Sequence, residues 1–249
     1  MATINTIFIL AGLAKQGLSW RDKLLSFLVL GLNSLGLHRR KLRKVFLFLI
    51  NWFADKEYVQ INLLINRRKA SLSMRKENEG DYLIAGELVG NFSGYGVPNF
   101  KPRYIIDAGA HIGAFTVFAK NYFPEAEVTC YEPDSANLKQ LNFNLSLNKI
   151  KADVRLLALW SGKSLLYYHS SSSQLGIVNT DITDKPIQGI LPEIGLDCWL
   201  KLDIEGSEYE VLPALFEKSM YPRWISMEVH YFNTRGKSCY LCYGSITMS

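Results

Sequence analysis

Two acids and two glycines recur at intervals in the stretch from residue 104 to residue 134. Asp107 precedes Gly109 by two positions, Gly113 follows four positions later, and Glu132 stands near the end of the stretch. In α/β proteins a glycine turn can lie beneath a bound nucleotide, and an acid at the end of the next strand accepts hydrogen bonds from the ribose hydroxyls. These residues therefore predict a nucleoside-binding site, with an ordinary α/β turn as the alternative.

The spacing of the glycines indicates which nucleoside would bind. A dinucleotide fingerprint is G-x-G-x-x-G, which brings a pyrophosphate onto the N-terminus of a helix. Here the pattern is Gly109-x-x-x-Gly113, and the middle glycine is missing. We therefore expect a nucleoside without a pyrophosphate, such as S-adenosylmethionine (SAM), with its ammonium held near Asp107 or by the carbonyls of the turn.

Regular elements must surround this turn if it is to hold a ligand. Residues 104–106 form a short apolar run typical of a buried parallel strand, residues 115–119 have helical apolar spacing, and residues 128–131 predict a second strand. Together they predict one strand-helix-strand crossover. Asp107 and Glu132 then lie at the carboxyl ends of strands, where ligands bind in open α/β sheets.

A second pair of acids follows the apolar run in "CWLKLDIEGSEYEVL", residues 198–212. Asp203 and Glu205 stand where this predicted strand ends, and their side chains point the same way if the chain is still extended there. Both would then face the same crevice, and repulsion between like charges would raise the pKa of at least one of them. Alternatively, one acid caps the following helix, a role that Ser207 or Glu208 could also take.

These blocks resemble the FkbM family of SAM-dependent methyltransferases. The resemblance rests on "IIDAGAHIGAFTVFA", "YEPDSANLKQLNFN" and "LKLDIEGSEYEVL", with "SLSMRKENEGDYLIAGELVGNFSGYG" as a lead-in, and it covers about residues 61–232. It implies an α/β, Rossmann-like class I methyltransferase sheet with helices on both faces. It also implies SAM as the cofactor and O-methylation of a sugar, a glycan or a glycosylated natural product.

Matching this sequence to the family's motifs assigns roles to individual residues. The implied cofactor-binding residues are Asp107, Gly109, Ala110, His111, Gly113, Glu132 and Asp203. The candidate catalytic bases are Asp203 and Glu205, followed by His111 and by His230, which lies in the predicted strand "WISMEVHY". We rank His230 below the acids because a lone histidine is more often structural, and we predict no metal site.

The C-terminus bears on whether the chain is active. Only seventeen residues follow Phe232, fewer than we expect for the antiparallel hairpin that normally closes a methyltransferase sheet. We therefore expect truncated C-terminal strands, which keeps a catalytically silent nucleoside-binding module as an alternative function. A nucleotide-cofactor oxidoreductase is a further alternative, against which the missing middle glycine argues.

Charge is distributed unevenly along the 249 residues. Residues 1–60 hold nine Lys or Arg against three acids, whereas residues 61–249 hold nineteen against twenty. We expect a basic helical extension over residues 1–60 and a methyltransferase domain over 61–249. Because the second region has no basic excess, it shows no nucleic-acid signature, and a small molecule or a glycan is the expected acceptor.

The N-terminal extension alternates apolar and basic segments. The apolar runs 24–37 and 45–53 flank a cluster of basic residues, namely Arg39, Arg40, Lys41, Arg43 and Lys44. Neither run reaches the about 20 residues that span a bilayer. Two interpretations compete: helices packed on the catalytic domain or a partner subunit, and an amphipathic patch, within residues 24–53, on an anionic membrane.

The cellular location is predicted from two further observations. The first cationic residue, Lys15, follows the first apolar stretch, whereas a secretory signal begins with its positive charge. The four cysteines are compatible with a reducing compartment. We therefore expect a cytoplasmic protein, with membrane association as the open alternative and the oligomeric state undetermined.

Overall fold

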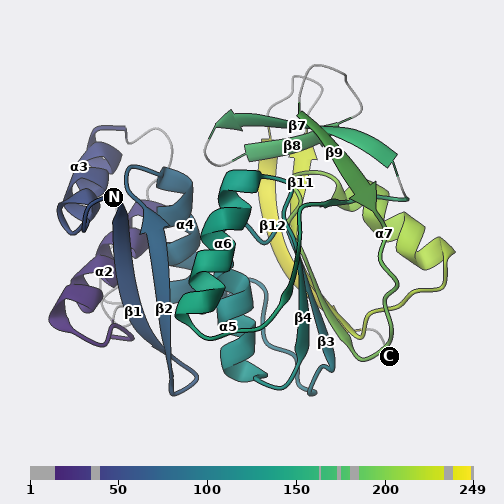
Figure 1. Cartoon of the computed structure of the whole chain (residues 1–249), viewed down its shortest axis with the longest axis horizontal. Helices are drawn as coiled ribbons and strands as arrows, with labels where there is room; N and C mark the ends of the chain where they lie inside the picture. The colour runs from purple at the N-terminus through teal and green to yellow at the C-terminus, as the bar shows by residue number, and fades with distance from the viewer. Residues whose placement is uncertain are drawn as a thin grey trace.

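The computed structural model describes residues 15–34, 40–162, 164–172, 175–179, 185–232 and 238–247. Its central sheet has six described strands in the order β12-β11-β10-β3-β4-β5 (Figure 1). These strands are β3 (Tyr104–Ala108), β4 (Glu127–Tyr131), β5 (Asp153–Arg155), β10 (Cys198–Leu202), β11 (Trp224–Phe232) and β12 (Ser238–Thr247). All pairings from β5 to β11 are parallel. The predicted α/β, Rossmann-like sheet is confirmed.

The last strand corrects one detail of that prediction. β12 is ten residues long and pairs antiparallel with β11 along its length, from Trp224 opposite Thr247 to Phe232 opposite Ser238. The residues after Phe232 are therefore sufficient for a closing edge strand, and the expected truncation is wrong for this strand.

Helices cover both faces of the sheet, as the alternation of buried side chains requires. Ile105 of β3 belongs to one buried cluster and Ile106 to another. The first cluster is covered by α4 (Glu79–Val89), α5 (Ala114–Tyr122) and α6 (Ser135–Leu147), and the second by α7 (Glu208–Glu217). Pro213 lies within α7.

Helices α5 and α6 start in different ways. Gly113 precedes α5 in the left-handed conformation with φ of +83°, which glycine adopts without steric penalty. Asp134 precedes α6, and its carboxylate accepts hydrogen bonds from the backbone N–H groups of Ala136 and Asn137, as expected of an N-cap. Both helices therefore begin directly at the edge of the sheet where the candidate site lies.

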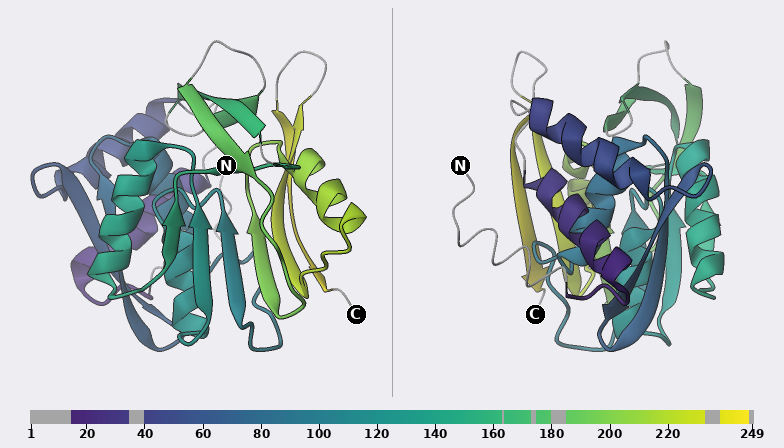
Figure 2. Two further views of the ribbon diagram at one scale, coloured as in Figure 1. Left: turned by 45° about the vertical axis from the view of Figure 1, so that its right-hand side comes forward. Right: turned by 90° about the vertical axis from the view of Figure 1, so that its left-hand side faces the viewer.

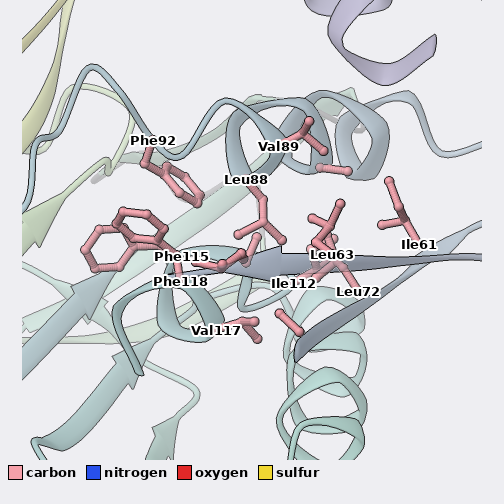
Figure 3. Packing of buried hydrophobic residues seen from close by; sticks show 14 of the residues in the cluster. Ile61, Leu63, Leu72, Leu88, Val89, Phe92, Ile112, Phe115, Val117 and Phe118 are labelled. Atoms are coloured by element: carbon pink, nitrogen blue, oxygen red, sulfur yellow. The ribbon is translucent and has the colours of Figure 1, made fainter. Parts of the chain in front are cut away.

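An additional layer lies outside α5 and α6 (Figure 1). It consists of a hairpin, β1 (Tyr58–Ile65) and β2 (Arg68–Arg75), and two helices, α2 (Trp20–Asn33) and α3 (Arg40–Trp52). Figure 3 shows side chains of the hairpin, such as Leu63 and Leu72, meeting Leu88 of α4 and Ile112 of the glycine turn. The same buried cluster contains Leu25 of α2, so α2 shares the core of the catalytic region. The domain boundary at residue 60 stays a prediction.

A second, four-stranded sheet is inserted between β5 and β10. Its order is β6-β9-β7-β8, from β6 (Ala158–Leu159), β7 (Ser164–Ser172), β8 (Leu175–Asn179) and β9 (Lys185–Ile190). Figure 2 shows this sheet at the end of the molecule toward which the parallel strands point. It therefore lies at the edge where the sequence places the site.

Candidate active site

The glycine turn after β3 is bonded to the chain that follows β4. The N–H groups of Gly109 and Ala110 both donate to the carbonyl oxygen of Tyr131, at 3.0 and 3.1 Å. The next N–H, that of His111, donates to Oε2 of Glu132 at 2.8 Å. The turn and Glu132 are thus held together, as the spacing predicted.

The same turn also contacts the chain that follows β10. Gly109 has φ of +72°, and a Cβ built on it would lie 1.8 Å from the backbone oxygen of Asp203. Such a contact does not occur between real atoms, so only glycine fits here. The residue is therefore required by the close approach of two protein segments, whereas the sequence suggested the approach of a ligand.

Glu132 is buried and its carboxylate is already partly engaged. Oε1 accepts from the backbone N–H of Asp134 at 2.8 Å and from the side chain of Asn137 at 3.4 Å, while Oε2 accepts from His111. Burial raises the pKa of Glu132 to about 7, although the N–H groups of Asp134 and His111 lower it. A carboxylate oxygen can accept two hydrogen bonds, so Oε2 can accept one more.

His111 contributes a buried nitrogen to the turn. Its Nδ1 makes no hydrogen bond within the described structure, which is rare for a buried polar atom. Burial lowers the pKa of His111, and the cations of Arg75 and Lys201 lower it further, outweighing the carboxylate of Asp81. The imidazole is therefore neutral near pH 7 and can bond to a ligand.

Lys201 is a buried cation beneath the turn, and the sequence analysis did not select it. Its Nζ donates to the carbonyl oxygen of Gly109 at 2.8 Å and lies 3.4 Å from Oδ1 of Asp107 and 3.4 Å from Oδ2 of Asp203. Burial lowers the pKa of Lys201, but Asp203 and Asp107 raise it by more, so the net shift is upward. Lys201 therefore stays charged.

This lysine changes the interpretation of Asp107. The carboxylate of Asp107 has no exposed surface, and its Oδ2 accepts from the hydroxyl of Thr116 at 2.6 Å while Oδ1 faces Lys201. The sequence assigned Asp107 or the turn carbonyls to the ammonium of SAM. In the structure the Asp107 carboxylate and the Gly109 carbonyl both face Lys201, and a contact between Asp107 and the cofactor ammonium stays a prediction.

Asp203 faces a second group of polar side chains. Its side chain is 15% exposed, and Oδ2 lies 3.2 Å from the hydroxyl of Tyr95, which is itself 3.4 Å from Oε2 of Glu228 in β11. Burial, and then the charges of Asp203 and Glu228, also raise the pKa of Glu87 in α4 well above its usual range.

The chain after β10 does not continue as an extended strand. β10 ends at Leu202, and Glu205 and Gly206 have positive φ of 53° and 99°. The condition under which Asp203 and Glu205 would point the same way is therefore not met, and that expectation is wrong. A left-handed turn replaces the alternation of side chains.

Glu208 stabilises this turn. Its buried carboxylate accepts from the backbone N–H groups of Ile204 at 2.9 Å and Gly206 at 2.8 Å. Ser207, at the N-cap position of α7, makes no side-chain cap bond. The two bonds of Glu208 hold the turn before α7 and do not cap the helix, and Asp203 remains directed toward Lys201 and Tyr95.

Arg75 and Asp81 of the lead-in segment form an ion pair that is linked to Glu132 through Asn137. Arg75 makes a two-pronged contact with the buried carboxylate of Asp81, at 2.9 and 2.6 Å, and donates to Asn137 at 2.7 Å. Because Asn137 also bonds to Glu132, this pair links β2 and α4 to the glycine turn. Paired guanidinium and carboxylate groups fix such geometry well.

The last two predictions concern His230 and a metal site. His230 lies in β11 opposite Leu241 of β12, but its side chain is outside the described residues. Among the described residues no group of three or more His, Cys, Asp or Glu could hold a metal ion.

One signal could have revealed the buried lysine. Lys201 interrupts the apolar run "CWLKL" in a strand that is buried on both faces. A lysine in such a place is almost never buried without a partner, so carboxylates on the adjoining strand should have been sought. Tyr95 and Glu87 carried no such signal, because α4 and the loop after it reach the site only through the tertiary fold.

The fold and the site together define a Rossmann-like α/β domain with a glycine turn and acids at three strand ends. The chain belongs to the FkbM methyltransferase family: the family model for the methyltransferase FkbM domain matches residues 107–240. The match begins at Asp107 and includes the glycine turn, Glu132 and the D-x-E-G block. The resemblance seen in the sequence is confirmed.

The chain is also similar to individual proteins. Methyltransferase sdnD of Sordaria araneosa is 27% identical over 168 residues, covering 50% of this chain and 65% of the relative. Methyltransferase 1 of Beauveria bassiana is 24% identical over 144 residues, covering 45% and 58%. The crystal structure of methyltransferase FkbM from Methylobacillus flagellatus is 16% identical and superposes with a TM-score of 0.38, covering 60% and 43%. The chain thus spans less than two thirds of the length of each.

Proposed function

We propose that this chain is a SAM-dependent O-methyltransferase that acts on a hydroxyl of a sugar, a glycan or a glycosylated natural product. One observation carries the proposal: the three family blocks meet at one edge of the sheet, where the glycine turn touches both Glu132 and Asp203. Family membership supports the reaction class. The O-directed chemistry and the acceptor class rest on the resemblance and on the acids described above.

The polar groups around the turn fit the nucleoside part of SAM. Oε2 of Glu132 retains capacity for one hydrogen bond from a ribose hydroxyl, and the buried Nδ1 of His111 lacks a partner within the described structure. His111 belongs to the glycine turn and Glu132 is bonded to it, so both groups lie where a nucleoside would bind. Because Lys201 already bonds to the carbonyl of Gly109, we do not assign the cofactor ammonium to that oxygen.

Asp203 is the residue that we propose removes the proton from the acceptor hydroxyl. Bound SAM supplies an electrophilic methyl group, and the hydroxyl oxygen that receives it must lose its proton. Asp203 is partly exposed and is oriented by Lys201 and Tyr95. Positioning contributes several kcal/mol to such reactions, and a placed base contributes about 10²- to 10⁴-fold.

The proton can move further along the same group of side chains. The Tyr95 hydroxyl has one proton and lies between Asp203 and Glu228. Once Asp203 is protonated it can donate to the Tyr95 oxygen, and Tyr95 can donate its own proton to Glu228. The acceptor proton is thereby transferred to Glu228 in β11, and Asp203 is restored as a carboxylate.

The two other functions predicted from the sequence, a silent nucleoside-binding module and an oxidoreductase, have less support than a methyltransferase. A silent module was favoured by the expected shortening of the sheet, and β12 removes that reason. An oxidoreductase is not supported by membership of a methyltransferase family. Neither alternative has an observation of its own in the structure.

The proposal is tested by incubating the full chain with SAM and a panel of free sugars, glycans and glycosylated natural products. We expect S-adenosylhomocysteine to be released with at least one acceptor, and a product mass increased by one methyl group. The Asp203→Asn variant is the control for background hydrolysis. Binding of SAM without turnover on any member of the panel would count against the enzymatic function.

A further inference from the structure

Helix α3 presents an unusual surface to solvent. Four apolar side chains at helical spacing, Val45, Phe48, Leu49 and Trp52, are 51%, 63%, 40% and 75% exposed. Residues spaced three and four apart share one face of a helix, so these residues form a continuous apolar stripe, which we call the outer face of α3. A cytosolic protein rarely leaves such a stripe uncovered.

The opposite face of α3 fixes the helix on the protein. The ring of Phe46 packs so closely on α2 that a Cβ at Gly31 would lie 2.2 Å from it, and Ile50 has no exposed surface. Arg43 is buried and pairs with Glu79 at the start of α4. The helix is therefore docked by one side, and Figure 2 shows α2 and α3 as an outer layer at one end of the molecule.

The charges on α3 indicate the chemistry of its partner. Arg40, Lys41 and Lys44 are exposed, and the sequence Arg40–Trp52 contains no acid. A second copy of this face would bring the same cations together without compensation. A surface that is both apolar and negatively charged complements it instead, and an anionic bilayer has these two properties.

The aromatic residues support the same partner. Phe48 and Trp52 lie with their ring centroids 6.2 Å apart on the outer face, and tryptophan is favoured at the level of lipid headgroups. No described helix is long and apolar enough to cross a membrane. An amphipathic helix with a basic polar side binds instead in the plane of the interface.

We propose that the outer face of α3 docks this protein on an anionic membrane, with Phe48 and Trp52 inserted among the headgroups and Arg40, Lys41 and Lys44 against the lipid phosphates. The proposal is independent of the methyltransferase reaction, because none of these residues belongs to the site around the glycine turn. It also decides between the two interpretations of the N-terminal segment. Helix α2 is packed in the core, and α3 is the part that meets lipid.

The structure dictates which residues to change. Arg43 must be kept because it is buried and paired with Glu79, and Arg39 lies outside the described residues. The test variants are Arg40→Gln/Lys41→Gln/Lys44→Gln for the charges and Phe48→Gln/Trp52→Gln for the apolar face. The matched control for the charges is Lys69→Gln/Lys101→Gln/Lys149→Gln, which removes three exposed cations elsewhere. The matched control for the apolar pair is Leu165→Gln/Leu196→Gln, at 63% and 69% exposure.

Flotation with vesicles provides the measurement. The full chain is mixed with phosphatidylcholine vesicles that contain about one third phosphatidylserine, and with pure phosphatidylcholine vesicles. Each basic residue near an anionic surface contributes about fivefold to binding, so the charge variant should bind anionic vesicles about 100-fold more weakly. The Phe48→Gln/Trp52→Gln variant should lose binding to the same vesicles, and raised salt should weaken wild-type binding through screening. Both control variants should bind like the wild type.

Three results would overturn the proposal. One is the absence of wild-type binding to anionic vesicles, and another is equal binding by the test and control variants. The third is a wild-type dimer that Phe48→Gln/Trp52→Gln converts to a monomer while vesicle binding is absent, which would make the outer face of α3 a self-association surface. Circular dichroism of each variant checks that the exposed substitutions leave the fold intact.

Discussion

Carboxylates on the two sides of the glycine turn have different surroundings. On the β4 side the donors that contact Glu132 are neutral N–H groups, and burial raises its pKa to about 7. On the β10 side Asp107 and Asp203 share the buried cation Lys201. Carboxylates therefore have two roles in this site. An acid among neutral donors suits the binding of hydroxyls, and acids beside a cation suit the handling of charge.

Removing the cation should have the largest effect. Lys201→Met leaves Asp107 and Asp203 without their shared partner, and breaking a buried ion pair from one side costs about 3–5 kcal/mol. We expect the free energy of unfolding in urea to fall by about that amount. Unfolding midpoints measured by circular dichroism check this.

A double variant sharpens the test of Lys201. Asp107→Asn/Lys201→Met removes one of the two stranded charges, so it should be more stable than Lys201→Met alone. Suppose instead that Asp107→Asn lowers the free energy of unfolding by the same amount in Lys201→Met as in the wild type. The two residues would then be energetically independent. That result would contradict the role given to Lys201.

The second prediction concerns the chemical step. Asp203→Asn keeps the size of the side chain and removes the charge, so it should lower the rate of methyl transfer at least about 100-fold while the affinity for SAM changes little. Glu205→Gln should have a milder effect, because Glu205 lies in the left-handed turn after β10, whereas Oδ2 of Asp203 lies 3.4 Å from Nζ of Lys201. Rates are measured as release of S-adenosylhomocysteine. Full activity in both variants would move the search to His111 and His230.

The third prediction concerns the opposite side of the turn. Glu132→Ala should weaken SAM binding about tenfold to 100-fold, since one hydrogen bond to a charged acceptor contributes about 1.5–3 kcal/mol. It should also loosen the turn, because the N–H groups of His111 and Asp134 lose their acceptor. Glu127→Ala, an exposed acid at the start of the same strand, is the matched control for calorimetric titration. Equal affinity in both variants would remove Glu132 from the site.

The fourth and smallest effect is a dependence on pH. The folded pKa of Glu132 lies above its ordinary value, so its contribution to folding is present at low pH and is lost as the pH rises through about 7. Ribose hydroxyls donate hydrogen bonds to the ionised carboxylate of Glu132. The affinity for SAM should therefore rise as the pH rises. From pH 6 to pH 8 the ionised fraction of a carboxyl with a pKa of about 7 rises about tenfold, and affinity should rise by up to that factor. The dependence should be absent in Glu132→Gln.

Much of the fold could be predicted because apolar residues recur at the spacing typical of strands and helices. The strands at β3, β4 and β10 and the helix α5 lie within a few residues of their predicted places, since apolar runs ending in Asp or Gly mark buried parallel strands. The approach of the turn to Glu132 followed from the same logic. These features are local in sequence, and local patterns determine them.

Other features depend on contacts between distant segments and could not be read. The sequence around Gly109 does not indicate that Asp203 approaches its backbone. The sequence around Asp107 does not indicate that its carboxylate faces Lys201. The direction of Glu205 was missed because its left-handed conformation depends on Glu208, which folds back over the turn. The sequence showed that residues 45–53 are apolar. Only the structure shows which side of α3 packs on α2 and which side is exposed.

Titration of the full chain with SAM, S-adenosylhomocysteine and NAD tests the central claim most directly, because it requires no knowledge of the acceptor. We expect SAM and S-adenosylhomocysteine to bind to one site per chain, and NAD, with its pyrophosphate, not to bind. Binding of NAD in place of SAM, or no binding of either adenosyl compound, would contradict the assignment of the glycine turn and Glu132 to this cofactor.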